Sequence, residues 1–332
     1  MKTHWMLKTN NDPLVATRQF LRSLWQAAGL EGMLLPVYQA DGLRVEAALL
    51  EDTRQLQQAD PFVPVLPANA ARLVQQLAEV QPQRRLGAVL RACEMRALAA
   101  LTARENLALE NWLVIGIDCV ACFPIQDYEW RVKKAGSPEA LTRQVLRNAR
   151  QGGVLHSRFR AACQMCSKPE AQKVDLCFGL LGLPVKEAIL VEAADQDTAE
   201  RFHLASITAG PALPELIVQH ERLLDKLESR RARFRERKTA ELPVDHPSTV
   251  EELVHFLAAC QPCQKCLEAC PVFPHELLPQ MKSGTIAIEA LRSWLVSCAE
   301  CGMCEQACPQ ASPLVAVFSR LSRQLKAEVV AA

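Results

Sequence analysis

The sequence predicts an α/β domain with a mostly parallel sheet, followed by a smaller all-α domain. Two observations support this prediction. Residues 85–118 read as strand, helix and strand, because the short apolar runs RLGAVL and NWLVIGID flank a segment rich in Ala and Leu. Near the C-terminus, apolar residues at helical spacing separate two copies of the cysteine motif C-x2-C-x2-C-x3-C-P.

Residues 1–80 are predicted to form an N-terminal α/β segment, and residues 81–215 the main α/β domain. The first segment has a helical pattern over 13–30, two strand-like runs at 33–38 and 43–50, and a helical pattern over about 68–79. The main domain contains the strand–helix–strand unit, whose strands should be parallel. A helix over 137–151 and a strand at 188–193 complete it.

A charged helical linker is predicted over 216–247. Residues 217–238 carry an apolar stripe with Leu223, Leu227 and Phe234 among many charged side chains. Such a helix is either a solvated connection or a docking surface for an acidic partner. The segment AELPVDHPST then breaks the chain, so the all-α domain is predicted over 248–332.

Composition excludes several classes of function. The formal net charge of +1 and the 5% of aromatic residues indicate no nucleic-acid partner. No apolar run reaches the roughly 18 residues of a transmembrane segment. The first residues lack the apolar core of a signal peptide, which predicts a cytoplasmic protein. Fourteen cysteines clustered at metal-ligand spacing in a chain of 332 residues indicate metal-bound thiolates rather than disulfides.

The two cysteine motifs predict two [4Fe–4S] clusters. Three cysteines at this spacing can hold one cluster, and the fourth lies too far along the turn, so that it ligates the other cluster. Zinc is the rival metal, but structural zinc usually takes paired C-x2-C arms. One cluster is therefore predicted on Cys260, Cys263, Cys266 and Cys308, and the other on Cys298, Cys301, Cys304 and Cys270.

The motifs resemble the α-helical two-cluster ferredoxin modules of heterodisulfide reductase and of succinate dehydrogenase iron–sulfur subunits. The resemblance implies electron transfer, and it leaves the substrate open because such modules conduct electrons without selecting a substrate. With this module, the predicted fold class is an α/β domain followed by an all-α two-[4Fe–4S] ferredoxin domain.

Six further cysteines lie in the α/β part, and four of them predict a third [4Fe–4S] cluster. Cys93 and Cys119 each follow a predicted parallel strand, and the carboxyl ends of neighbouring parallel strands share one edge of the sheet. The C-x2-C pair Cys163 and Cys166 completes a set of four. Cys122 is the alternative to Cys119 or Cys93, whereas Cys177 is expected to be buried and unligated.

The segments LRACEMRALAAL, WLVIGIDC and ACQMCSKPEAQKVDLCFGLLG resemble the C-terminal domain of the coenzyme F-420 hydrogenase/dehydrogenase beta-subunit family, over about residues 80–195. Cys93, Cys119, Cys163 and Cys166 stand at that family's cysteine positions, although Ala92 replaces its proline before the first. The resemblance implies FAD beside a [4Fe–4S] cluster. Gly179 and Gly182 match its glycine-rich turn and imply cofactor contact there, with a plain turn as the alternative.

No catalytic motif is present, so catalytic residues are left unassigned, and His156 is the one histidine near a predicted ligand, Cys163. The resemblance implies an iron–sulfur subunit of a hetero-oligomeric oxidoreductase. It would relay electrons between a catalytic subunit (a hydrogenase, or a molybdenum- or tungsten-pterin formate dehydrogenase) and a flavin, deazaflavin or other carrier. The alternatives are a free-standing iron–sulfur flavoenzyme that reduces a sulfur compound or quinone-type acceptor, and a zinc scaffold.

Overall fold

The computed structural model describes residues 1–152, 158–260 and 263–331, and within these ranges a seven-stranded sheet forms the centre of the α/β part. In spatial order the strands are β1 (Thr3–Lys8), β7 (Ala188–Ala193), β6 (Leu176–Gly179), β5 (Trp112–Ile117), β4 (Leu86–Arg91), β2 (Gly32–Tyr38) and β3 (Val45–Leu50). The four strands β6, β5, β4 and β2 run parallel, and antiparallel strands flank them. Residues 1–80 and 81–215 therefore contribute strands to the same sheet.

The predicted parallel pair is confirmed in β4 and β5. Leu86 lies opposite Trp112 and Arg91 opposite Ile117, and every residue of both strands is buried. Strands covered on both faces need apolar side chains in both directions, which explains their continuous apolar sequences.

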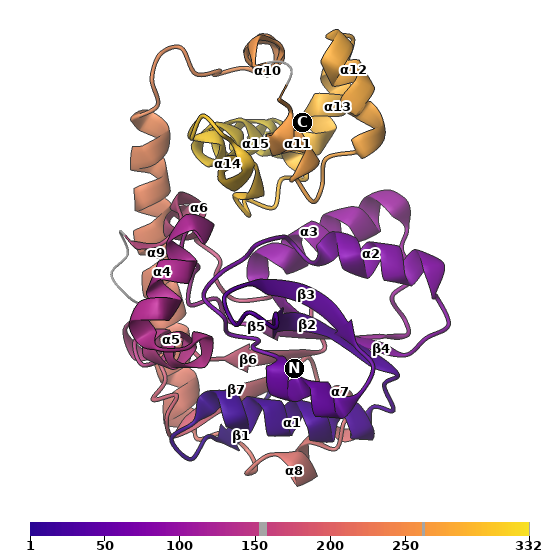
Figure 1. Ribbon diagram of the computed structural model, residues 1–332, viewed down its shortest axis with the longest axis vertical. Coiled ribbons are helices and arrows are strands. Elements are labelled where there is room, and N and C mark those ends of the chain that lie inside the picture. Colours follow the sequence, from indigo (N-terminus) through magenta and orange to yellow (C-terminus); the bar gives the residue numbers. More distant parts are fainter. Residues whose placement is uncertain (153–157, 261–262, 332) are drawn as a thin grey trace.

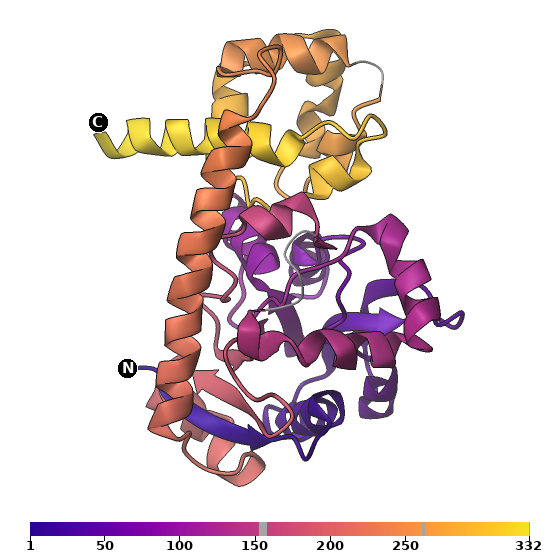
Figure 2. The same ribbon diagram turned by 90° about the vertical axis from the view of Figure 1, so that its left-hand side faces the viewer.

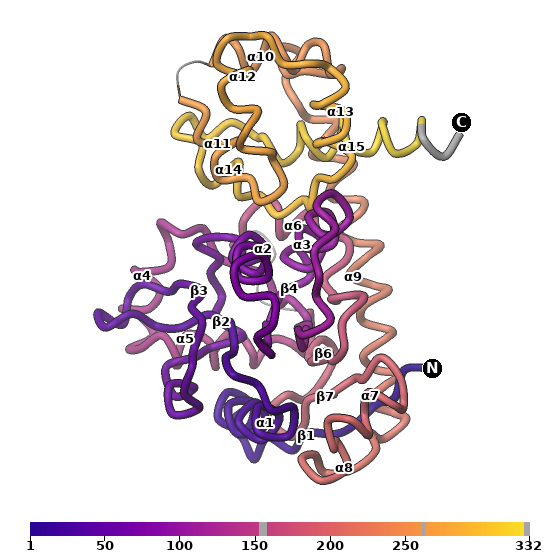
Figure 3. Tube along the Cα trace, turned by 90° about the vertical axis from the view of Figure 1, so that its right-hand side faces the viewer, coloured from indigo at the N-terminus to yellow at the C-terminus, as the bar shows by residue number. Residues whose placement is uncertain are grey.

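Helices cover both faces of the sheet. The first nine are α1 (Pro13–Ala27), α2 (Ala71–Val80), α3 (Ala92–Glu105), α4 (Ile125–Ala135), α5 (Pro138–Leu146), α6 (Ala161–Met165), α7 (Gln196–Arg201), α8 (Leu204–Ile207) and α9 (Pro214–Ala240). Side chains of α1, α4 and α5 share one hydrophobic core with the sheet, and those of α2 and α3 share the other. Figure 3 shows α2 and α3 side by side between the sheet and the C-terminal part.

The C-terminal part is helical and packs on α2 and α3 (Figure 1). Its helices are α10 (Val250–Ala259), α11 (Lys265–Glu268), α12 (Leu278–Ser283), α13 (Ile288–Val296), α14 (Met303–Ala307) and α15 (Leu314–Ala331). Val74 and Leu98 belong to the same buried core as Phe273, Leu291 and Leu321. The predicted fold class, an α/β domain followed by an all-α domain, is confirmed.

The charged helix predicted over 217–238 is present as α9, which runs along the side of the molecule (Figure 2). It contacts α6 of the α/β part and α15 of the C-terminal part. Leu227 from its predicted apolar stripe is 1% exposed, and His220 and Arg231 are also buried. One face of α9 is thus packed against both parts of the chain.

Some predictions from the sequence were wrong or incomplete. Gly179, expected in a glycine-rich turn after a strand-like segment at 173–176, is instead the last residue of strand β6 (Leu176–Gly179), which lies between β5 and β7. The edge strand β1 and the helix α4 were not predicted. His156 lies outside the described residues. None of the helices in the described part of the chain is long and apolar enough to cross a bilayer.

Candidate metal centres

Five cysteines of the α/β part converge at the carboxyl edge of the sheet. Cys93 lies in the first turn of α3 directly after β4, and Cys119 follows β5. Cys163 lies in α6 and Cys166 ends it. These four thiols line one small cavity, so the structure brings together the residues predicted for a third cluster. We call this cavity the sheet-edge site.

Cys122 is the fifth member of this group. It is 1% exposed, and its backbone N–H donates to Cys163 Sγ at 3.4 Å. A hydrogen bond with Cys122 is the main cause that lowers the pKa of the Cys119 thiol to about 7, against the effect of burial. Cys122 does not line the cavity, whereas Cys119 does. Cys177 lies in β6 in the apolar core, also away from the cavity, as expected for an unligated residue.

Two buried arginines line the sheet-edge site. Arg160 is 8% exposed and Arg231 is 2% exposed, and the Nε atom of each has no partner among the described residues. Arg231 Nη1 donates to the carbonyl of Cys166 at 3.3 Å. The pKa of Cys163 is held low mainly by its hydrogen bond with Cys122 and further by Arg160, against burial. Buried cations favour bound thiolates, so the surroundings fit an anionic thiolate-held cluster.

The sheet-edge site adjoins the second cysteine motif. Arg160 Nη2 donates to the carbonyl of Cys301 at 2.9 Å, and its Nη1 donates to Gln306 Oε1 at 3.0 Å. A Cβ atom on Gly302 would lie 2.4 Å from Ala162 Cβ, so only a glycine permits this approach of the motif to α6. The guanidinium of Arg160 thus lies between Cys163 and Cys301.

Arg96 makes a second link between the two parts. Its Nη2 lies 3.6 Å from Cys166 Sγ, and its Nε donates to the carbonyl of Ala299 at 3.1 Å. Nearby, Arg72 donates to the carbonyls of Cys270 and Phe273, and Arg104 Nη1 donates to that of Val272 at 2.7 Å. Arginines of α2 and α3 thereby satisfy loop carbonyls of the C-terminal part that its short helices leave unpaired.

In the C-terminal part, each cysteine triple has the last cysteine of the other motif as its neighbour. Burial raises the pKa of Cys266 to about 12, and repulsion from Cys308 and then repulsion from Cys260 are the next largest causes. Burial likewise raises the pKa of Cys301 to about 11, with Cys270 contributing next. The structure therefore places the thiols in the two groups predicted for crossed ligation. Ligation itself remains a prediction.

The chemistry of the donors fits iron–sulfur ligation. Among the described residues, no three His, Cys, Asp or Glu side chains stand close enough to hold a single metal ion. What converges is three groups of cysteine thiols, one at the sheet edge and two in the C-terminal part. Burial and mutual repulsion raise the pKa values of most C-terminal thiols, and such crowded thiols become favourable when a metal binds their deprotonated forms.

Gly179 and Gly182, predicted as cofactor contacts, lie against α9. A Cβ atom on Gly179 would lie 3.1 Å from His220 Nε2, and one on Gly182 would lie 2.8 Å from the carbonyl oxygen of Gln219. The backbone of Gly182 is also left-handed, with φ of +87°. Close packing of α9 therefore accounts for both glycines, and cofactor contact at these positions stays a prediction.

His220 fixes α9 to the sheet through buried charges. Its Nδ1 lies 2.7 Å from the carbonyl of Leu181 and 3.5 Å from the carboxylate of Asp118, and its Nε2 lies 3.4 Å from that of Glu192. Burial opposes the charge of His220, but Asp118 and Glu192 outweigh burial and raise its pKa to about 9. The protonated imidazole therefore joins the two carboxylates at neutral pH.

Comparisons with known proteins fit this geometry. Residues 259–312 match the family of 4Fe–4S dicluster domains. This range contains all the cysteines of both motifs, so the chain carries an iron–sulfur electron-transfer domain. No curated protein matches the chain. Among solved structures, a chain from the F420-reducing [NiFe] hydrogenase complex of Methanosarcina barkeri aligns with a TM-score of 0.52 and 12% identity, covering 72% of this chain and 92% of that one. At this identity the likeness concerns the fold.

Sequence reasoning missed the side chains that connect the groups. Arg160 and Arg96 stand beside cysteines in the sequence, but nothing local shows that they reach the loop around Cys301. The one available signal was the closeness of Arg160 to the C-x2-C pair, since buried thiolates attract cations.

Proposed function

We propose that the chain is the electron-relay subunit of an oxidoreductase complex. The observation that carries this proposal is the contact of Arg160 with both the sheet-edge site and the Cys301 loop. It supports an unbroken series of three cluster sites: the sheet-edge site, the site on Cys298, Cys301, Cys304 and Cys270, and the site on Cys260, Cys263, Cys266 and Cys308. Bound [4Fe–4S] clusters exchange single electrons.

Cysteines, the shared apolar core and buried arginines of the chain surround this series of sites. Cysteines from two strand ends and α6 form the sheet-edge site, and the core shared by α2, α3 and the C-terminal helices fixes its distance from the other two sites. Buried arginines supply positive charge where thiolates gather, which favours the reduced state of a bound cluster.

The partner is proposed to be a catalytic subunit of hydrogenase or of molybdenum- or tungsten-pterin formate dehydrogenase type. Two facts support this. The sequence resembles the F-420 hydrogenase/dehydrogenase beta-subunit family, and the fold resembles a chain from an F420-reducing hydrogenase complex. FAD or a deazaflavin is the proposed two-electron carrier beside the sheet-edge site, and the family resemblance implies contact with it at Gly179 and Gly182.

Anaerobic purification from the native host tests the proposal. We expect about twelve iron atoms per chain, from three cubane clusters, and a co-purifying catalytic subunit identified by mass spectrometry. An isolated monomer that contains flavin and reduces a sulfur compound or quinone would instead favour the free-standing flavoenzyme. A colourless zinc protein would refute both.

A further inference from the structure

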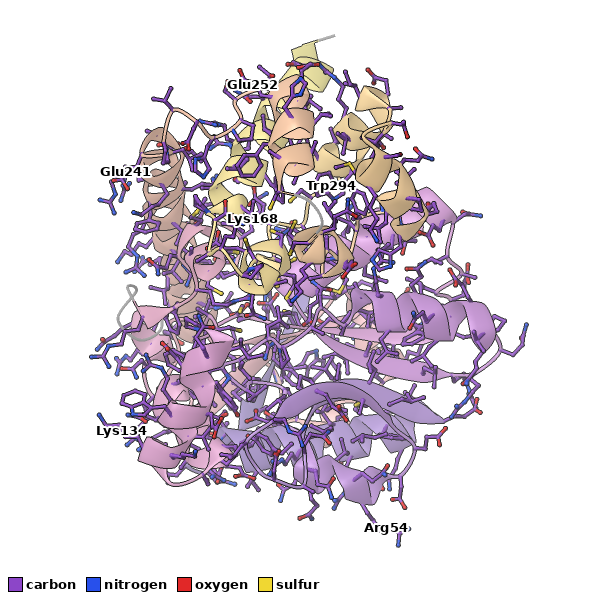
Figure 4. All side chains as sticks on the ribbon, turned by 45° about the horizontal axis from the view of Figure 1, so that its top comes forward. Arg54, Lys134, Lys168, Glu241, Glu252 and Trp294 are labelled. Carbon is purple, nitrogen blue, oxygen red and sulfur yellow. The ribbon has the colours of Figure 1, made fainter. Side chains whose placement is uncertain are left out.

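We propose that a basic groove beside Cys298 is the docking site for an acidic electron-carrier protein, an inference that rests on the proposed relay. The groove has a volume of about 310 Å³ and lies between α3, the segment 168–173 and the end of α13. Cys298 and Arg96 line it. Lys168, labelled in Figure 4, belongs to the same lining, and its backbone carbonyl accepts from the Cys166 thiol at 3.4 Å.

The groove is lined by positively charged side chains, and in the described part of the chain its lysines are not neutralised by nearby carboxylates. Lys168, Lys173 and Lys326 are exposed, and none of their ammonium groups has a hydrogen bond or ion pair within the described residues. Glu170, the carboxylate in the lining, is already paired with Lys2 at 2.8 Å. Three lysines from two distant segments therefore present unpaired charge on one rim, as a surface that steers an anionic partner does.

The position of the groove suits electron exchange. The middle site of the proposed series is the one on Cys298, Cys301, Cys304 and Cys270. Its predicted ligand Cys298 lines the groove directly. Arg96 reaches from the groove to Cys166 of the sheet-edge site. A partner seated here would stand next to the middle site of the series. In the exchange the donor loses one electron and the middle site gains it, with no bond formed or broken and no proton transferred.

A protein fits the groove better than a small carrier. The volume lies at the lower end of the roughly 300–1,000 Å³ that enclose a drug-sized ligand. The lysines extend outward into solvent, where they can meet carboxylates on a partner's surface. A larger groove of about 600 Å³, with Arg150, Arg222 and Lys226, lies against α9, but no cysteine lines it.

Stopped-flow reduction of the cluster-loaded protein tests the proposal. The donor is a strongly acidic reduced two-iron ferredoxin, and the bleaching of visible absorbance gives the bimolecular rate constant. K168Q/K173Q/K326Q is compared with K8Q/K186Q/K226Q, which removes the same charge from exposed lysines elsewhere, including the rim of the α9 groove. We expect the groove variant to react roughly tenfold more slowly at low ionic strength and to approach wild type at about 0.5 M salt.

Reduction by the cationic methyl viologen radical distinguishes failure of the docking site from failure of the proposed electron relay. We expect it to be undiminished in both variants, because steering by lysines does not favour a cation. Normal viologen bleaching with an unchanged ferredoxin rate in the groove variant, or an equal loss in the control, would overturn the docking site alone. If wild-type protein is not bleached by viologen, the proposed relay and the docking site both fail. If free FMN blocks ferredoxin in wild type but not in the groove variant, the occupant is a small phosphate-bearing carrier, and the choice of a protein is wrong.

Discussion

Replacing Arg160 with Gln should destabilise the contact between the two parts of the chain. It should also lower the reduction potential of the middle cluster site, the one predicted on Cys298, Cys301, Cys304 and Cys270. The buried guanidinium donates to the Cys301 carbonyl at 2.9 Å and to Gln306 Oε1 at 3.0 Å. Each hydrogen bond from a charged donor contributes roughly 1.5–3 kcal/mol, so the loss of both should lower the free energy of unfolding by about 3–6 kcal/mol. Urea denaturation of the cluster-loaded protein, followed by circular dichroism, measures this loss.

The same substitution removes a positive charge beside the Cys301 loop. A unit charge roughly 8 Å away, at an effective dielectric constant of about 20, contributes on the order of 2 kcal/mol, which is on the order of 100 mV for one electron. We therefore expect the reduction potential of the middle site to fall by on the order of 100 mV in R160Q. A titration monitored by electron paramagnetic resonance gives this potential.

Two variants make the test specific. Lys at position 160 keeps the charge but not the two-pronged donor, so R160K should recover most of the potential and only part of the stability. Gln at the exposed Arg158 removes a charge two residues away and should change neither quantity. If R160Q keeps both the stability and the potential of wild type, Arg160 does not connect the two sites.

Three further predictions follow from other contacts. C163S should lower iron from about twelve to about eight atoms per chain, by the cubane count, and eight in fully loaded wild type would refute the third cluster. G302A should lower the melting temperature and disturb the middle cluster's paramagnetic signal, because φ is +70° and the new Cβ would meet Ala162 at 2.4 Å; a wild-type melting curve would contradict this packing. The pKa of His220 is raised from 6.5 to about 9, so its contribution of roughly 3 kcal/mol should be complete below pH 6.5 and lost as pH rises through 9. H220Q should accordingly lose more stability at pH 6 than at pH 10, where only the packing and the hydrogen bond of the neutral imidazole with Leu181 are lost, and an equal loss at both would show that the charge of His220 contributes nothing.

The sequence predicted the sheet-edge group because local rules were sufficient there. β4, α3 and β5 are a continuous unit with strong apolar runs, and parallel neighbours end at the same edge, which brings Cys93 and Cys119 together. The bounds of strand β6 were not predicted correctly, because the strand has only four residues and ends in a glycine, a pattern that also fits a turn.

The junction with the C-terminal part could not be predicted in the same way. Arg160 and Cys301 are 141 positions apart, and their contact depends on how two separately patterned units pack. The glycines at 179 and 182 show the same difficulty. Their tolerance of close approach was apparent, but whether a cofactor or a helix would occupy the space depended on where α9 lies.

Helix α9 is a rigid connection between the α/β part and the C-terminal part, because it contacts both. Its 27 residues span about 40 Å, and it is held near one end by His220 and further along by contacts with α6 and α15. A helix held at several points should prevent a hinge motion between the two parts. The tunnelling distance between the sheet-edge site and the middle site should therefore vary little with thermal motion. We therefore expect the rate of electron flow to be set by encounters with other molecules at the surface, and not by opening and closing of the chain.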